Sequence, residues 1–300
     1  MRGFLASIKA RIATRRAGLY RWAHVALPLA LLLGITGLRV SGSSWIELAQ
    51  FQAFDAFMRH KPRLYRQAPV RIVDIDEASL RKLGQWPWPR EILARLVDKI
   101  SAAGAAAIAF DMVFPETDRL GPRNDAAFAR SIARAPVVLG VAMRRMPSPS
   151  LPMIKASFAS RGELGAFALP FDGAVPNLPE FERAASGVGA FTTSVELDGV
   201  IRRVPLALSI KERIMPSLAA EALRVAQGAS NYAVKSSRTD SRGRQDTGIE
   251  KIKIGRLILP TDERGRMWIY PTPEVAGRSL PAWKILDGSF DPAKVSGCIV

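Results

Sequence analysis

Val70-Arg71-Ile72-Val73-Asp74-Ile75-Asp76 is the first of three runs that indicate the fold class. The others are Gly84-Gln85-Trp86-Pro87-Trp88-Pro89-Arg90 and Ala106-Ala107-Ile108-Ala109-Phe110-Asp111. The first and third runs are rich in apolar residues and end in aspartate, which predicts two buried strands. Between them, Pro89 suits the first position of a helix, and Gly104 is well placed to cap its end. Strand, helix and strand together predict a right-handed βαβ unit with parallel strands.

The flanking segments extend this pattern. Trp45–Met58 carries apolar residues at helical spacing. A second helix is expected to begin at Asn124 or Asp125, and Ala135–Val141 is expected to be the next strand. These units predict an α/β fold with a mixed, largely parallel sheet flanked by helices and preceded by one N-terminal transmembrane helix.

The second half of the chain gives weaker patterns. Residues 142–185 are rich in proline and glycine and are expected to form loops and short elements. Residues 229–250 are polar and are expected to form a loop. The Asp198-Gly199 turn predicts a hairpin between Val188–Thr192 and Ile201–Leu208. Further elements are expected as a helix at Pro216–Gln227, strands at 251–255, 257–259 and 267–270, and a short helix at Pro281–Asp287. Because Cys298-Ile299-Val300 begins an apolar stretch, we expect the given chain to be a fragment that is cut short within a strand.

The N-terminus has the pattern of a membrane anchor. Residues 1–21 hold six lysines and arginines and no acidic residue, and residues 22–40 are nearly all apolar. The positive-inside rule then predicts a cytoplasmic N-terminus, a transmembrane helix over 22–40 and an extracytoplasmic domain over 41–300. The alternative is a cleaved signal peptide, with small residues at Ser41-Gly42-Ser43-Ser44. The long basic stretch and Arg39 favour a retained anchor.

Composition narrows the range of functions. A net charge of +16 is typical of proteins that bind either nucleic acid or a membrane surface. The predicted extracytoplasmic location of the main domain argues against binding to nucleic acid. With only two histidines, catalysis by a histidine base and a histidine-ligated metal site are not expected. A single cysteine excludes an intramolecular disulfide. Cys298 is expected to be a buried, inert thiol. Because no phosphate-loop, His-Glu-x-x-His or Gly-x-Ser-x-Gly pattern occurs, we expect no catalytic residues, cofactor, metal or enzymatic activity within these residues.

Three runs of the sequence resemble the type-two CHASE domain (CHASE2), the cyclase- and histidine-kinase-associated sensory extracellular family of bacteria. They are Val73–Leu80, Gly84–Arg90 and Ala109–Glu116; Asp198–Pro205 and Gly297–Val300 also fit. The resemblance implies a periplasmic sensory input domain in the bacterial inner membrane. A cyclase, diguanylate cyclase or histidine kinase output would lie outside the given residues. It also implies a periplasmic small-molecule or protein signal, a lipid bilayer partner and, by analogy, a homodimer.

Asp74, Asp76 and Asp111 are the first candidate ligand-binding residues. They fall at the carboxyl ends of two predicted parallel strands, the edge where open α/β sheets bind ligands. Such carboxylates recognise a cationic or hydroxylated ligand or a hard cation, or they cap helices, accept loop hydrogen bonds or pair with Arg90. An anchored enzyme that uses the three aspartates as acid, base or metal ligands is the alternative function.

Trp86, Trp88 and Arg90 complete the candidate ligand-binding set. The tryptophan pair either lines a ligand or partner surface or fixes the turn by closing the end of the sheet. Arg90 either binds an anion at a helix start or pairs with an aspartate. Arg202 and Arg203, after the Asp198-Gly199 turn, pose the same choice between binding an anion and serving as ordinary charges at a strand end.

Overall fold

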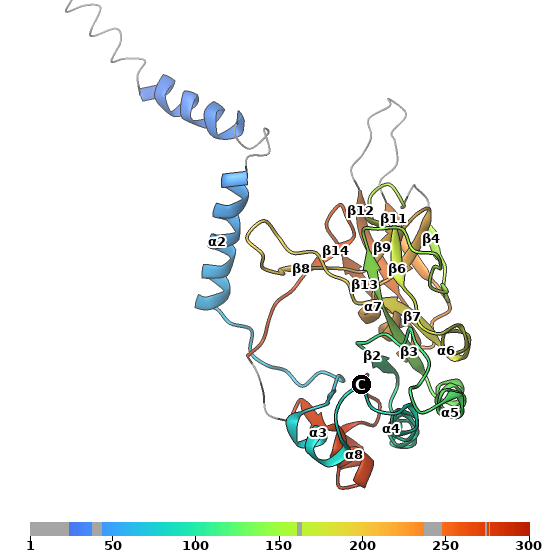
Figure 1. The fold of residues 1–300 in the computed structure, drawn as a ribbon. Coiled ribbons are helices and arrows are strands. Elements are labelled where there is room, and N and C mark those ends of the chain that lie inside the picture. The colour runs from blue at the N-terminus through green and yellow to red at the C-terminus, as the bar shows by residue number, and fades with distance from the viewer. Residues whose placement is uncertain (1–23, 38–43, 161–163, 237–247, 274, 276) are drawn as a thin grey trace, which may run out of the picture. The chain divides into compact units, whose positions relative to one another are not determined.

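The computed structural model describes residues 24–37, 44–160, 164–236, 248–273, 275 and 277–300 (Figure 1). The chain divides into two compact units, Met1–Pro62 and Arg63–Val300, and each is described by itself. The predicted basic segment 1–21 and both ends of the predicted span 22–40 lie outside the described residues.

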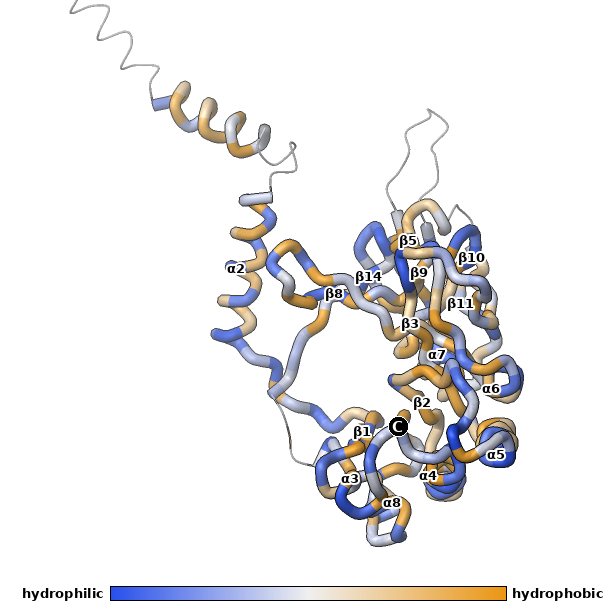
Figure 2. Tube along the Cα trace, viewed as in Figure 1, coloured by the Kyte–Doolittle hydropathy of each residue, from blue (hydrophilic) through white to orange (hydrophobic). Residues whose placement is uncertain are grey.

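The described residues of the first unit form two helices. Residues 24–37 form one helix, along which Figure 2 shows mainly apolar residues. The other is α2 (Ser44–His60), with Glu47 in its first turn and Arg59 in its last, charges that suit the helix dipole. The helix predicted over Trp45–Met58 is therefore confirmed. Among the described residues, no helix is both long and apolar enough to cross a membrane.

A largely parallel sheet forms the centre of the second unit. β3 (Val137–Arg144) lies between β2 (Ile108–Phe110) and β7 (Gly187–Ala190), and β1 (Ile72–Asp74) pairs with β15 (Ser279–Pro281), all in parallel. The predicted mixed, largely parallel sheet with flanking helices is confirmed. The antiparallel component is β6 (Gly173–Val175), which pairs with the end of β3.

The two strands of the predicted βαβ unit, β1 and β2, run parallel but are not direct neighbours. Ile299 forms parallel bridges to Val70 on one side and to Ala107 on the other. In Figure 1 the C-terminus accordingly lies beside β2. A segment from the far end of the chain therefore lies between two strands that are close in sequence.

Five helices share one core with one face of this sheet. They are α3 (Glu77–Leu83), α4 (Arg90–Ala102), α5 (Pro122–Arg134), α6 (Pro179–Ala184) and α8 (Ala282–Asp287). α4 begins at Arg90, one residue later than predicted, because Pro89 is its N-cap; Gly104, with φ of +82°, follows the C-cap residue Ala103. α5 begins earlier than predicted, because Pro122 occupies its first turn after Gly121. α3 was not predicted.

Four phenylalanines fill the centre of this core. Phe110, Phe114, Phe128 and Phe181 meet edge to face, with ring centroids 5.2–6.2 Å apart. Such pairs contribute about 0.5–1.5 kcal/mol each beyond the area that they bury. They come from β2, the loop after it, α5 and α6, so the cluster ties the helices to the sheet.

α7 (Leu218–Ala226) packs on the opposite face, against β7, β3 and β2. Beyond it lies a mixed sheet in the order β13 (Leu257–Pro260), β12 (Ile249–Ile254), β11 (Tyr232–Ser236), β4 (Phe158–Ser160). The other strands are β5 (Leu169–Phe171), β9 (Ala207–Ile210) and β10 (Arg213–Pro216) in one sheet, and the pair β8 (Arg203–Pro205) and β14 (Arg266–Trp268). A 3₁₀ turn spans Pro292–Lys294.

Several predictions for this half needed correction. The predicted hairpin between Val188–Thr192 and Ile201–Leu208 was wrong, because β7 pairs with β3 while β8 pairs with β14. The turn itself is present, with Gly199 at φ of +81°. β11 and the first two residues of β12 lie within the segment predicted as a loop over 229–250, so that prediction was wrong for them; residues 237–247 lie outside the described residues.

Candidate functional site

Asp74 and Asp76 lie at the end of β1 but have different surroundings. Asp74 is exposed at the last position of the strand, opposite Pro281. Asp76 caps α3, because its carboxylate accepts a hydrogen bond from the Ser79 amide at 2.7 Å. Hydrogen bonding from Ser79 lowers the pKa of Asp76. Of the roles expected for the candidate aspartates, Asp76 therefore has that of a helix cap.

The two tryptophans also differ. Trp88 is only 1% exposed, and its indole N–H donates to the Gly84 carbonyl at 2.8 Å. Trp86 is 41% exposed and meets Trp88 edge to face, with ring centroids 5.9 Å apart. Trp88 is thus a core residue that fixes the turn, whereas Trp86 presents an aromatic surface to solvent.

Arg90 is held by groups of the loop after β2. Its amide donates to the Asp118 carboxylate at 2.6 Å, and its guanidinium donates to the Glu116 carbonyl at 3.3 Å. The guanidinium also lies 3.8 Å from Asp125 and 4.6 Å above the Phe114 ring. Burial lowers the pKa of Arg90. Pairing of Arg90 with an aspartate was one of the two expected roles. Its partners are Asp118 and Asp125, not the candidate residues Asp74, Asp76 or Asp111.

Asp118 organises the start of two helices. Its carboxylate accepts from the Arg90 amide of α4, from the Leu120 amide at 2.7 Å and from the Asn124 side chain of α5 at 3.1 Å. Burial opposes its ionisation, but these hydrogen bonds outweigh burial and lower the pKa of Asp118. Asp118 accordingly acts as a structural acceptor.

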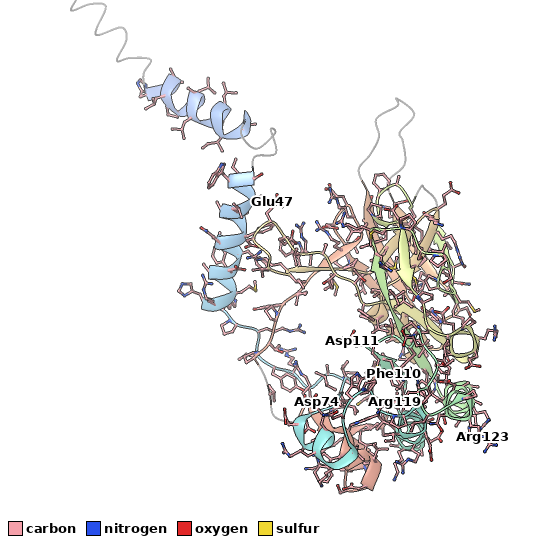
Figure 3. All side chains as sticks on the ribbon, in the orientation of Figure 1. Glu47, Asp74, Phe110, Asp111, Arg119 and Arg123 are labelled. Carbon is pink, nitrogen blue, oxygen red and sulfur yellow. The ribbon has the colours of Figure 1, made fainter. Side chains whose placement is uncertain are left out.

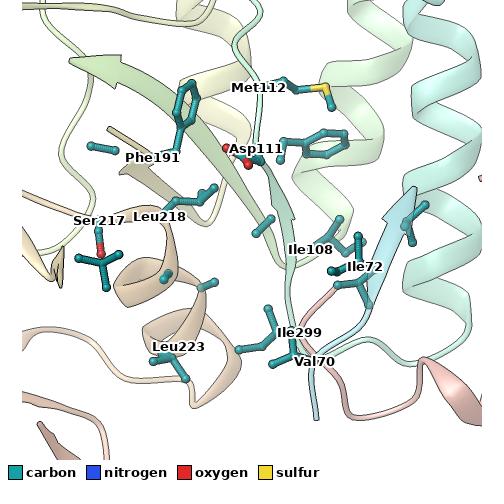
Figure 4. Close-up of a pocket in the computed structure, with 18 of the residues that line it drawn as sticks. Val70, Ile72, Ile108, Asp111, Met112, Phe191, Ser217, Leu218, Leu223 and Ile299 are labelled. Carbon is teal, nitrogen blue, oxygen red and sulfur yellow. The ribbon is translucent and has the colours of Figure 1, made fainter. Parts of the chain in front are cut away.

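Asp111 lies apart from these groups, at the end of β2 (Figure 3). Its exposed carboxylate belongs to the rim of a groove of about 610 Å³. The walls of the groove are mostly apolar side chains from β1, β2, α4, α7 and the segment around Ile299 (Figure 4). No local sequence pattern predicts the groove, because α7 and Ile299 reach it from distant parts of the chain.

The model of the CHASE2 domain matches residues 29–300. The chain belongs to the CHASE2 domain family. This is a family of sensory extracellular domains of signal-transduction receptors, so the suspected family is confirmed. No curated protein and no solved structure matches the chain.

The arginines after the Asp198-Gly199 turn are paired within this CHASE2 domain. Arg202 makes a bidentate pair with Asp198 at 2.7 and 2.9 Å, and Arg203 makes one with Glu196 at 2.7 Å for both bonds. Arg203 also lies 3.3 Å from Asp262. Pairing with Arg202 lowers the pKa of Asp198 to about 2. These contacts stabilise the Asp198-Gly199 turn, as expected for bidentate guanidinium–carboxylate pairs.

A buried polar cluster behind α7 was missed in the sequence. Glu221 is fully buried and pairs with Arg224 at 2.7 and 2.9 Å. The Tyr232 hydroxyl of β11 donates to Glu221, and the Arg224 guanidinium donates to the Ser186 carbonyl at 2.9 Å. Burial, with the charge of Glu221, raises the pKa of Tyr232 far above its usual range. The spacing of three residues between Glu221 and Arg224 on one helix was the available clue.

The arrangement of the CHASE2 domain limits the chemistry that it supports. Among the described residues, no group of three or more histidine, cysteine, aspartate or glutamate side chains is placed to hold a metal ion. β1 and β2, which carry the three candidate aspartates, are separated by the Ile299 segment. The described geometry therefore gives no support to the alternative of an enzyme that uses an aspartate cluster. It offers an apolar groove and exposed side chains, which suit binding.

Proposed function

We propose that this chain is the membrane-anchored extracytoplasmic input domain of a bacterial signal-transduction receptor. The observation that carries the proposal is the CHASE2 match over residues 29–300, since the family is a sensory extracellular one. The match begins within the predicted anchor and continues through the whole α/β unit. The output module, a nucleotide cyclase, diguanylate cyclase or histidine kinase, would lie outside these residues.

The apolar helix over residues 24–37 supports the anchor. Leu27, Leu29, Leu31, Leu32 and Leu33 are each more than half exposed within the described chain. A helix that is apolar on all sides needs an apolar environment, and burial of a leucine side chain is favourable by roughly 1.5–3 kcal/mol. A bilayer supplies that environment. The basic residues before it favour a cytoplasmic N-terminus and a periplasmic domain.

The signal would act by shifting a conformational equilibrium. A ligand or protein partner that binds one state of the periplasmic domain more tightly raises the population of that state. Of the six candidate residues, Asp74, Trp86 and Asp111 present exposed side chains, whereas Trp88 is buried and Arg90 is engaged in the fold. We therefore propose contact with the signal for the first three, in a domain that works as a homodimer.

A topology experiment tests the anchor and compartment. Alkaline phosphatase, which is active only outside the cytoplasm, is fused after Gly228, and β-galactosidase is fused at the same position as the reciprocal reporter. We expect phosphatase activity alone. A matched control deletes residues 22–40 and should abolish that activity. Activity of β-galactosidase alone in the intact chain would reject a periplasmic domain.

A further inference from the structure

The turn between β7 and β8 exposes apolar side chains and buries a charged one. Its four large apolar side chains are between 43% and 62% exposed: Val195, Leu197, Val200 and Ile201. Glu196, between the first two, is only 8% exposed. Figure 2 shows apolar residues along this turn where it extends from the sheets of the second unit. A single exposed apolar residue is ordinary, but a contiguous group indicates a contact surface, and residues 195–201 are therefore named the apolar turn.

Hydrogen bonds hold the backbone of the apolar turn in one conformation. The Gly199 amide donates to the Glu196 carbonyl at 2.9 Å, and the Glu196 amide donates to the Val200 carbonyl at 2.9 Å. The two bidentate ion pairs described above stabilise the same turn through its side chains. A surface that is already ordered loses little conformational entropy when it binds.

The two carboxylates of the apolar turn carry their counter-charges with them. Asp198 lies 2.7 Å from the Arg202 guanidinium, and Glu196 lies 2.7 Å from the Arg203 guanidinium. Transfer of a hydrogen-bonded ion pair out of water costs much less than transfer of a lone charge. The charged residues are therefore compatible with the entry of the neighbouring apolar side chains into an apolar environment.

Two aromatic side chains lie next to the base of the apolar turn. Trp268 is paired with Arg203 across the β8–β14 ladder, and its ring centroid lies 5.0 Å from the Arg203 guanidinium carbon. Ile269 continues this pairing, because its amide donates to the Arg202 carbonyl at 2.8 Å. Trp268 is 45% exposed and Tyr270 is 41% exposed. Tryptophan and tyrosine are the residues enriched at the boundary between lipid hydrocarbon and water.

The size of the apolar turn favours a bilayer over a second copy of the chain. A stable interface between two proteins buries roughly 800 Å² on each partner, and four side chains that are at most 62% exposed supply well under that area. A bilayer makes no such demand on area. The proposed anchor already holds the domain at the membrane, so the contact is intramolecular and a few side chains suffice.

We propose that the apolar turn inserts its four apolar side chains into the bilayer to which the chain is anchored. Trp268 and Tyr270 then lie at the level of the lipid headgroups, and the ion pairs of the turn lie beside them. This inference rests on the proposed function for the presence of the bilayer. It adds a second point of membrane contact, which belongs to the α/β unit and is separate in sequence from the N-terminal helix.

Fluorescence quenching of the full chain in vesicles of phosphatidylethanolamine and phosphatidylglycerol tests the proposal. The fluorophore is attached to Leu197→Cys, in a Cys298→Ser background that leaves no other thiol. Arg130→Cys, at an exposed position of α5, is the matched control. With a nitroxide on the lipid acyl chains, we expect quenching at residue 197 to exceed quenching at residue 130 at least ~3-fold, because inserted apolar side chains reach about 5–10 Å into the leaflet.

A charge placed in the apolar turn gives a second measurement. With the fluorophore at Val195→Cys, the further substitution Leu197→Asp should reduce quenching at least ~2-fold, because a carboxylate in hydrocarbon is costly. Ile258→Asp is the matched control, since Ile258 is 58% exposed on β13, and it should leave the quenching unchanged. An equal reduction by the two substitutions would overturn the proposal.

A fluorophore at Leu31→Cys, in the N-terminal helix, separates this inference from the proposed anchor. Quenching at Leu31, with quenching at Leu197 no greater than at the Arg130 control, would overturn the insertion and keep the anchor. Quenching at Leu197 alone would reject the anchor and still support the membrane contact, and quenching at neither position would overturn both. Near-complete disulfide formation between unlabelled Leu197→Cys chains, without quenching at that position, would assign the apolar turn to a second copy and also overturn the proposal.

Discussion

The two faces of the central sheet are held by different physical means. On the face of α4 and α5, four phenylalanines interlock edge to face. On the face of α7, small residues let the helix approach the strands closely: a Cβ at Gly189 would lie 2.7 Å from the Cα of Leu218. The buried Glu221–Arg224 pair fixes this second helix. The packing of α4 and α5 on the sheet therefore depends on the volume of large aromatic side chains. The packing of α7 depends on the geometry of the buried ion pair and on glycine, which has no side chain to keep the helix away from the strands.

Phe128→Ala should have the largest effect. Phe128 is fully buried and contacts three other phenylalanine rings, so its loss leaves a cavity that the sheet and helices cannot close. We expect the free energy of unfolding to fall by about 3–5 kcal/mol. Denaturant titration measures this. Leu223→Ala, on the wall of the open groove, is the matched control and should cost less than half as much; equal losses would remove the distinction between packed core and groove.

Glu221→Gln tests the polar face. The substitution keeps the size of the side chain but leaves the Arg224 guanidinium buried without its counter-charge. We expect a loss of about 3 kcal/mol in the free energy of unfolding, because removal of one partner of a buried pair is strongly destabilising. The double variant Glu221→Gln, Arg224→Leu should recover part of this loss. A double variant less stable than the single one would contradict the uncompensated charge as the cause.

Gly187→Ala tests the close approach of strand and helix. A Cβ at this position would lie 2.6 Å from the Glu221 Cγ, so the polar cluster has to shift. Overpacking of this kind costs about 1–3 kcal/mol, visible as a lower denaturant midpoint. Gly165→Ala is the control, since a Cβ there meets no atom within 4 Å. If both variants unfold alike, close packing does not limit this face.

Asp76→Ala separates a helix cap from a ligand contact. Loss of the hydrogen bond to the Ser79 amide should lower the melting temperature modestly, because an orphaned amide remains at the start of α3. Asp76→Ser restores an N-cap acceptor and should recover most of that loss, as measured by thermal unfolding. Failure of serine to recover stability would mean that the carboxylate has a role other than capping.

The smallest expected effect is on stability at acidic pH. The folded pKa of Asp198 is lowered to about 2 by its pair with Arg202, below an unfolded value near ~3.9. The contribution of this pair is therefore present above pH ~3.9 and is lost as pH falls through about 2. A carbon-13 titration of the Asp198 carboxyl should show a midpoint near 2, and Asp198→Asn identifies the resonance. A midpoint near 4 would exclude the bidentate pair in solution.

Local features of the fold and site followed from the sequence. The start of α4 after Pro89, the turn at Gly199 and the capping alternative for Asp76 depend on residues close in sequence. The partners of Arg90 did not follow, because Asp118 and Asp125 belong to a loop and helix placed by the core. The groove was also missed, since its walls join α4, α7 and the segment around Ile299.

The CHASE2 family, the α/β class and most helices follow from the amino-acid sequence alone, because periodicity, caps and turns act over a few residues. The place of the Ile299 segment between β1 and β2, and the cluster of Glu221, Arg224 and Tyr232, follow from the folded structure. Strand order and buried pairing depend on contacts between residues far apart in sequence. Such contacts form where the burial of apolar side chains offsets the entropy lost in closing long loops. This balance depends on the whole chain, so a local sequence pattern does not predict it.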